Sequence, residues 1–247
     1  MIYIYSDGIH TNDSLVITIQ DIFPHATIRL CTASMIFSGC LQNTCDLFIM
    51  PGGADLFYCE KLNGNGNQVI RDYVHNGGAY LGICAGAYYG CATLNWNNGE
   101  ISEVRELAFY KGQANGPVYA WTETPDSIYD GSWKKAVTIQ TADAKAISTF
   151  YDGGPVFEDG SHDRVIARYT DLPDLPPAIV GGLFGKGHYI LSSPHIERFG
   201  HRLNDGLYKH RNTSFEREKK VIEDLIPHEK EQKDFFKSIL SGLLNTK

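Results

Sequence analysis

The chain carries Ala79-Tyr80-Leu81-Gly82-Ile83-Cys84-Ala85-Gly86-Ala87-Tyr88, and this stretch decides the fold. It starts as a short apolar run typical of a buried strand and continues through Gly-Ile-Cys-Ala-Gly into small residues typical of a helix. A strand that turns directly into a helix strains the backbone of the residue at the turn, and side chains at the flanking positions would collide. The pattern therefore predicts an elbow that raises Cys84 above a sheet. The alternative is that Cys84 is one more buried apolar residue.

Segments before this stretch predict a parallel α/β sheet. Apolar runs at residues 2–5, 26–30 and 46–50 are typical of strands. Residues 68–75 are typical of a helix that ends at Gly77-Gly78, after a polar loop at 63–67. A further helix is expected from residues 12–14 onward, burying Leu15, Val16, Ile19 and Ile22. Strands that alternate with helices in this way form a parallel sheet with helices on its faces.

The C-terminal half is expected to be β-rich, with a helix at its end. Strands are predicted at 107–110, 136–140, 146–150 and 165–169, followed by a pair at 178–183 and 188–192. The charged tail from residue 214 is predicted to be helical. It carries an apolar stripe of Phe235, Phe236, Ile239, Leu240, Leu243 and Leu244. The stripe is most simply a face docked on the sheet, and the alternative is a helix that binds a partner. We expect one domain over 1–200 and a helical extension over 201–247 packed on it.

Composition narrows the classes of function. The formal net charge of −7 argues against a broad nucleic-acid surface, because clustered Lys and Arg supply most phosphate binding. The chain has no apolar run long enough to span a membrane and no secretory leader, so we expect a soluble, cytoplasmic protein without a membrane partner. The six cysteines are scattered and form no Cys-Xaa-Xaa-Cys pair, so neither disulfide staples nor a zinc site is expected. We expect no metal and no cofactor.

A cysteine nucleophile needs a base, and that base needs a group that orients it. His195 is the best candidate among nine histidines, because it follows a predicted strand and has Glu197 two residues further on. The carboxyl ends of strands in an open α/β sheet gather at one crevice, so His195 and Cys84 can meet there. The alternative is that His195 is an exposed loop residue.

Acyl transfer also needs backbone donors aimed at the developing negative charge, the oxyanion hole. Pro51-Gly52-Gly53-Ala54-Asp55 follows a buried strand, and its two glycines allow a close approach to substrate. We expect Gly52 and Gly53, together with the N–H of Ala85, to form this hole. An ordinary Gly-Gly turn is the alternative.

These segments resemble the class I glutamine amidotransferase-like superfamily over about residues 1–200. Within it the chain looks most like the N-terminal domain of eukaryotic-type biotin-protein ligases and its free-standing bacterial relatives. The more specific motifs are the Ala-Gly-Ala-Tyr continuation after Cys84 and the Gly-Gly-Pro segment at 153–155. The resemblance implies a flavodoxin-like, mostly parallel sheet flanked by helices, with Cys84 as nucleophile, His195 as base and Glu197 as its orienter. It also implies a substrate pocket that includes Asp55, Tyr58, Tyr88, Gly153 and Gly154.

The chain departs from true glutaminase domains at two positions. Tyr88 stands where they usually carry glutamine four residues after the nucleophile, and Ser193 stands where they carry glutamine two residues before the histidine. No nucleotide loop or second catalytic domain of a ligase fits in 247 residues, so biotin transfer by this chain alone is not expected.

Three hypotheses remain open. The first is a thiol hydrolase or acyl transferase for a small-molecule or peptide amide. The second is a non-catalytic regulatory module that binds a ligand or a partner enzyme, and the third is a peptidase-like hydrolase.

Overall fold

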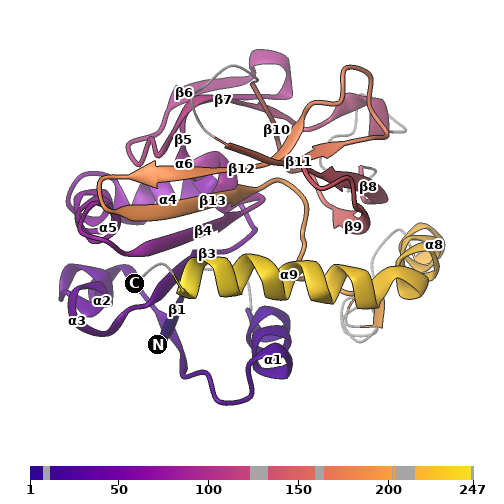
Figure 1. Ribbon diagram of the computed structural model, residues 1–247. Coiled ribbons are helices and arrows are strands. Elements are labelled where there is room, and N and C mark those ends of the chain that lie inside the picture. Colours follow the sequence, from indigo (N-terminus) through magenta and orange to yellow (C-terminus); the bar gives the residue numbers. More distant parts are fainter. Residues whose placement is uncertain (8–11, 123–132, 159–163, 202, 204–214, 246–247) are drawn as a thin grey trace.

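The computed structural model describes residues 1–7, 12–122, 133–158, 164–201, 203 and 215–245 (Figure 1). Part of the predicted C-terminal extension, residues 204–214, lies outside these ranges. Within the described part, no helix is long and apolar enough to cross a membrane.

A nine-stranded sheet forms the centre of the molecule. Its first five strands are parallel, and the other four continue the sheet in antiparallel pairs. The α/β prediction is therefore confirmed, and the antiparallel strands are the β-rich second half. The spatial order is β2 (Ile28–Cys31), β1 (Ile2–Tyr5), β3 (Leu47–Met50), β4 (Ala79–Ile83), β13 (Gly187–Ser192), β12 (Pro177–Phe184), β11 (Arg164–Tyr169), β8 (Lys135–Thr141) and β9 (Ala146–Tyr151).

Helices cover both faces of the parallel half, which explains why its three inner strands β1, β3 and β4 are buried at every position. Tyr3 and Tyr5 pack in one core, while Ile2 and Ile4 pack in the other. The first core takes side chains from α2 (Ala33–Phe37), α3 (Cys40–Thr44), α4 (Asp55–Leu62) and α5 (Asn65–His75). The second takes them from α1 (Asp13–Ile22) and α9 (Glu229–Leu244).

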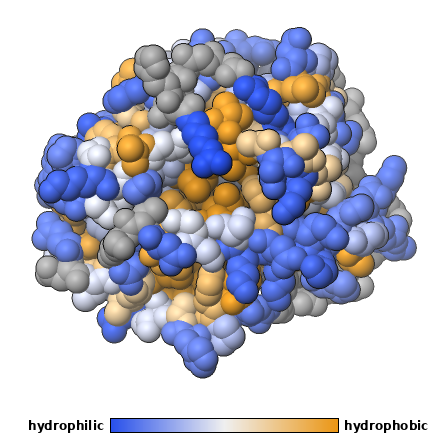
Figure 2. Space-filling view, viewed as in Figure 1, coloured by the Kyte–Doolittle hydropathy of each residue, from blue (hydrophilic) through white to orange (hydrophobic). Residues whose placement is uncertain are grey.

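The apolar stripe predicted near the C-terminus is docked on the sheet. Helix α9 buries Phe236, Ile239, Leu240 and Leu243 and contacts β9 and β4. Figure 1 shows this helix, in yellow, running across the molecule from α8 (Phe215–Leu225) toward β1. In the space-filling view of the same face, apolar residues gather in the hollowed centre between hydrophilic margins (Figure 2).

A second, four-stranded sheet stands beside the first, in the order β10 (Val156–Phe157), β7 (Tyr110–Gly116), β5 (Cys91–Trp96) and β6 (Ile101–Val104). Strand β5 begins where the short helix α6 (Ala85–Gly90) ends, so the elbow connects the two sheets. The sequence did not predict this second sheet.

Two local predictions are wrong. Residues 107–109 are not a strand, because β7 starts at Tyr110; Leu107 and Phe109 are apolar because they are buried in the core. The predicted loop at 63–67 is largely helical, since α5 starts at Asn65. Gly64, with φ of +80°, makes the turn into α5, and Gly66 packs closely on Leu62.

Candidate active site

Cys84 lies between β4 and α6 in the strained conformation expected of an elbow, with φ of +51° and ψ of −105°. Its backbone N–H donates to the Ser192 carbonyl at the end of β13, at 2.8 Å. The flanking glycines are required by close backbone packing. A Cβ on Gly82 would lie 2.3 Å from the Gly86 carbonyl oxygen, and one on Gly86 would lie 2.0 Å from that of Met50.

His195 and Glu197 lie in the segment that follows β13. The His195 backbone N–H donates to the Phe150 carbonyl at 2.7 Å, which ties this segment to the end of β9. Nδ1 of His195 is 2.7 Å from Oε1 of Glu197, and both residues are almost completely buried. The histidine therefore has an orienting carboxylate, and the alternative of an exposed loop histidine is wrong.

Because Gly52 has no side chain, His195 and Cys84 can both lie close to the turn that follows β3. A Cβ on Gly52 would lie 2.5 Å from Cε1 and 3.2 Å from Nε2 of His195, and 3.5 Å from Cβ of Cys84. The ring edge that carries Nε2 thus faces the turn after β3, next to the cysteine. The thiol of Cys84 donates to the Asp152 carbonyl oxygen at 3.4 Å.

The two buried ionisable groups stabilise each other's charge. Burial favours the neutral form of His195, but the Glu197 carboxylate and the neighbouring Cys84 together outweigh burial, and the histidine pKa is raised to about 9. Burial also favours the neutral form of Glu197 and would on its own raise the pKa of this carboxyl. The adjacent His195 reverses that effect, and the pKa of Glu197 is lowered. At neutral pH the site therefore holds an imidazolium beside a carboxylate.

The residues predicted for the oxyanion hole border this site. Gly53 is exposed and has φ of +146°, and Gly52 touches both Cys84 and His195. The Tyr58 hydroxyl donates to the carbonyls of Pro51 and Gly52, at 3.0 and 3.1 Å, and so fixes this turn. Ala85 is the first residue of α6.

Comparison with known proteins gives the family. A family model described as "Biotin-protein ligase, N terminal" matches residues 1–246. The chain belongs to the biotin-protein ligase N-terminal domain family. It is 30% identical over 213 residues to a biotin–protein ligase of Schizosaccharomyces pombe, an alignment that covers 79% of this chain and 33% of the ligase. It is 42% identical over 163 residues to an uncharacterized protein of Chlamydia muridarum, covering 63% of this chain and 62% of that protein.

The chain thus spans about a third of the yeast ligase and under two thirds of the chlamydial protein. Among solved structures, it is similar to a glutamine amidotransferase from Thermotoga maritima, with a TM-score of 0.59 and 13% identity over 99% of this chain and 97% of that one. This likeness confirms the amidotransferase-like fold.

In this member of the biotin-protein ligase N-terminal domain family, Gly153 and Gly154 pack against residues that neighbour Cys84 and His195. The Tyr88 hydroxyl donates to the Gly153 carbonyl at 3.1 Å. A Cβ on Gly154 would lie 2.2 Å from the Ser193 carbonyl oxygen, so this glycine packs directly on the segment that leads to His195. Tyr88 is almost completely buried, and burial raises its pKa well above the usual range. The Tyr88 hydroxyl is therefore neutral.

Asp55 lies at the start of α4, directly after the glycine turn, and is held by an arginine that the sequence prediction missed. Nε of Arg105 is 2.7 Å from Oδ2 of Asp55, and its Nη1 is 2.8 Å from Oε2 of Glu103. Burial raises the pKa of Asp55, and Arg105 opposes this without reversing it. An isolated arginine after a strand carries no signal in the sequence that would reveal this pairing.

Gln232 of α9 is a second residue that the sequence prediction missed. It is fully buried, and its Nε2 donates to the carbonyl oxygens of Arg198, His195 and Ile196 at 2.9, 3.3 and 3.3 Å. Its position four residues before Phe236 places it on the buried face of the helix. That spacing is the one sequence signal that could have identified it.

Proposed function

We propose that this protein is an amidotransferase-like thiol hydrolase or acyl transferase with a Cys84-His195-Glu197 triad. The observation that carries the proposal is the arrangement around Gly52: a Cβ there would lie 3.5 Å from Cβ of Cys84 and 3.2 Å from Nε2 of His195, while Glu197 is 2.7 Å from Nδ1, the other ring nitrogen. The substrate we propose is a small-molecule or peptide amide.

In the proposed reaction, the Cys84 sulfur, as thiolate, attacks the amide carbonyl carbon. The resulting oxyanion is stabilised by the backbone N–H groups of Gly52 or Gly53 and of Ala85. Protonated His195 donates its proton to the leaving nitrogen as the C–N bond breaks, which releases an amine and leaves a thioester.

In the second half of the reaction, water or an acceptor amine attacks the thioester carbonyl. His195, now neutral, removes a proton from this nucleophile, and the C–S bond breaks to regenerate the thiolate. The raised pKa of His195 suits the role of proton donor in the first half.

The substrate we propose is not glutamine. Both positions where glutaminase domains usually carry glutamine are committed to internal contacts, since the Tyr88 hydroxyl binds the Gly153 carbonyl and Oγ of Ser193 is 2.6 Å from the Tyr169 hydroxyl. Neither side chain offers a free group to a substrate amino acid.

Thiol reactivity tests the activated nucleophile. We expect a mild alkylating reagent to label Cys84 in the folded protein faster than Cys59, although Cys84 is the more buried of the two. Cys59 is a control because it is more exposed than Cys84, although burial raises its pKa to about 11 and so slows its own reaction; Cys91 is a second, fully buried control. Mass spectrometry of the digested protein reads out all three. If Cys84 labels no faster than Cys59 and Cys91, the activated nucleophile is refuted.

Turnover is tested separately with a panel of amides and peptides, comparing wild type with Cys84→Ala. Release of amine by the wild type alone supports the acyl-transfer proposal. Cleavage restricted to peptides would support the peptidase-like alternative, and no turnover of any panel member would count against catalysis.

A second candidate is a non-catalytic module that binds a ligand or a partner enzyme. It is favoured by the thiol's position, because Cys84 is only 5% exposed and donates to the Asp152 carbonyl. Since the yeast relative is a biotin–protein ligase, the partner we propose in this case is an enzyme of that kind. If Cys84→Ala preserves the cellular phenotype while Gly53→Trp, which fills the crevice, abolishes it, binding is favoured over catalysis.

A further inference from the structure

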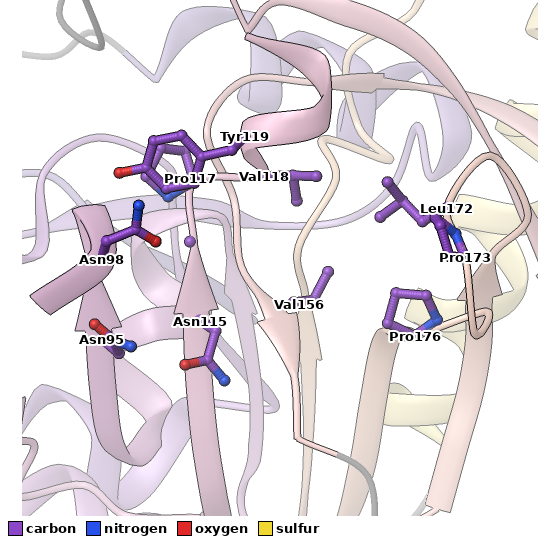
Figure 3. Close-up of a pocket in the computed structure, with 11 residues that line it drawn as sticks. Asn95, Asn98, Asn115, Pro117, Val118, Tyr119, Val156, Leu172, Pro173 and Pro176 are labelled. Atoms are coloured by element: carbon purple, nitrogen blue, oxygen red, sulfur yellow. The ribbon is translucent and has the colours of Figure 1, made fainter. Parts of the chain in front are cut away.

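A pocket of about 300 Å³ lies between the second sheet and the loop that joins β11 to β12 (Figure 3). Cys84, His195 and Glu197 do not line it. None of its lining residues carries a charge, so the pocket has no counter-ion to offer a charged ligand. An ionised ligand would lose hydration there without compensation, which favours a neutral one.

One wall of the pocket presents carboxamides. Asn95 on β5 and Asn115 on β7 are directly opposite each other in the parallel pairing of the two strands, and Asn98 follows just after β5. Oδ1 of Asn95 is buried and has no hydrogen-bond partner among the described residues. An unpaired buried acceptor is unfavourable, and turning the Asn95 carboxamide over, which exchanges Oδ1 and Nδ2, would present this acceptor to a ligand N–H in the pocket.

The opposite wall is apolar. Figure 3 shows Leu172, Pro173 and Pro176 facing the three asparagines across the pocket, with Val156 between the two sides. Rigid proline rings and aliphatic side chains suit the face of a flat molecule, and the carboxamides suit its edge. A carboxamide pairs in two places with an edge that carries a C=O next to an N–H, because it offers one acceptor and one donor side by side.

We infer that this pocket binds a neutral, planar ligand with an amide-type edge, such as a lactam, a cyclic ureide or a nucleobase. Cys84, His195 and Glu197 do not line the pocket, but the residues that do line it contact residues next to the thiol site. A Cβ on Gly116 would collide with the Tyr88 hydroxyl, while the Val118 N–H donates to the Tyr151 hydroxyl at 2.8 Å. The Tyr151 hydroxyl in turn donates to the Gly154 carbonyl at 2.8 Å. A ligand in this pocket would therefore be separated from Cys84 by Tyr88, Tyr151 and Gly154.

The inference is tested by ligand-observed NMR with uracil as the probe and the whole chain as the receptor. Uracil carries two N–H groups beside carbonyls, and 1,3-dimethyluracil has the same ring with both N–H groups blocked. We expect millimolar uracil to bind and 1,3-dimethyluracil to bind about tenfold more weakly, since it cannot donate to the Asn95 carboxamide.

Three variants locate the binding. Asn95→Leu should weaken uracil binding about tenfold, while Gln140→Leu, which removes an exposed carboxamide elsewhere, should leave it unchanged. Val156→Trp should abolish binding by filling the pocket without altering its carboxamides. Thermal unfolding of each variant establishes that it is folded.

The inference is overturned if uracil does not bind, if 1,3-dimethyluracil binds equally well, or if folded Val156→Trp binds uracil like wild type. The test is independent of the proposed catalysis, because Cys84→Ala is expected to bind uracil unchanged. Loss of turnover with retained uracil binding, or the reverse, shows which of the two proposals has failed.

Discussion

Replacing Glu197 by glutamine should remove most of the pH dependence that His195 gives to the stability of the fold. The substitution preserves the size of the side chain and removes its charge. In the wild type, burial favours neutral His195, but the Glu197 carboxylate at 2.7 Å, with a smaller contribution from Cys84, outweighs burial and raises the histidine pKa from 6.5 to about 9. In Glu197→Gln the effect of burial is no longer opposed by that carboxylate, and His195 should be neutral at pH 7.

The sign and size follow from linkage. A group with a higher pKa in the folded than in the unfolded state stabilises the fold while it is protonated. The contribution of His195 is therefore complete below pH 6.5 and is lost as the pH rises through about 9. A difference of about 2.5 pH units corresponds to about 3 kcal/mol at ~1.4 kcal/mol per unit.

Urea unfolding at about pH 6 and about pH 9.5 measures this contribution. Between these two conditions, the free energy of unfolding should fall by about 3 kcal/mol more in the wild type than in Glu197→Gln. Glu223→Gln, an exposed glutamate on α8, is the matched control and should behave like the wild type. Equal pH dependence in the wild type and Glu197→Gln would refute the reasoning.

Three other predictions concern the same site. Gly52→Ala should displace the His195 ring, since the new Cβ would lie 2.5 Å from its Cε1, and mass spectrometry should show at least about tenfold slower alkylation of Cys84. Gln232→Leu removes the donor to the Arg198 carbonyl and should lower the free energy of unfolding in urea by about 1–2 kcal/mol; an unchanged midpoint would contradict this. Arg198→Gln removes a positive charge that lowers the pKa of His195, so NMR titration of the ring should show His195 losing its proton at higher pH than in the wild type.

The elbow could be predicted from sequence because its geometry is set by five consecutive residues. The positive φ of Cys84 and the close approaches at Gly82 and Gly86 are local consequences of a strand that turns into a helix. The parallel half of the sheet could be predicted for a similar reason: its strands are buried on both faces and read as continuous apolar runs.

The rest depends on contacts between distant segments. The Asp152 carbonyl meets the Cys84 thiol because β9 ends beside the crevice, and this follows from the order of strands in the sheet rather than from residues near either position. The second sheet was missed because β7 carries two glycines and an asparagine, β5 carries an asparagine in place of a clear alternation, and β10 is only two residues long. Leu107 and Phe109 led to a wrongly predicted strand because they are apolar. They are buried in the core without being paired in a strand.

The position of Gln232 links the C-terminal helix to the proposed triad. A polar residue on the buried face of an apolar stripe must find partners, since an unpaired buried amide is costly. Its partners are the carbonyls of the segment that carries His195, so the contacts that dock α9 on the sheet also fix the backbone of the proposed base. Loss of packing at Phe236 or Leu240 should therefore disturb the His195 ring as well as stability. On this reasoning α9 belongs to the proposed active site, although none of its side chains touches the Cys84 sulfur among the contacts described.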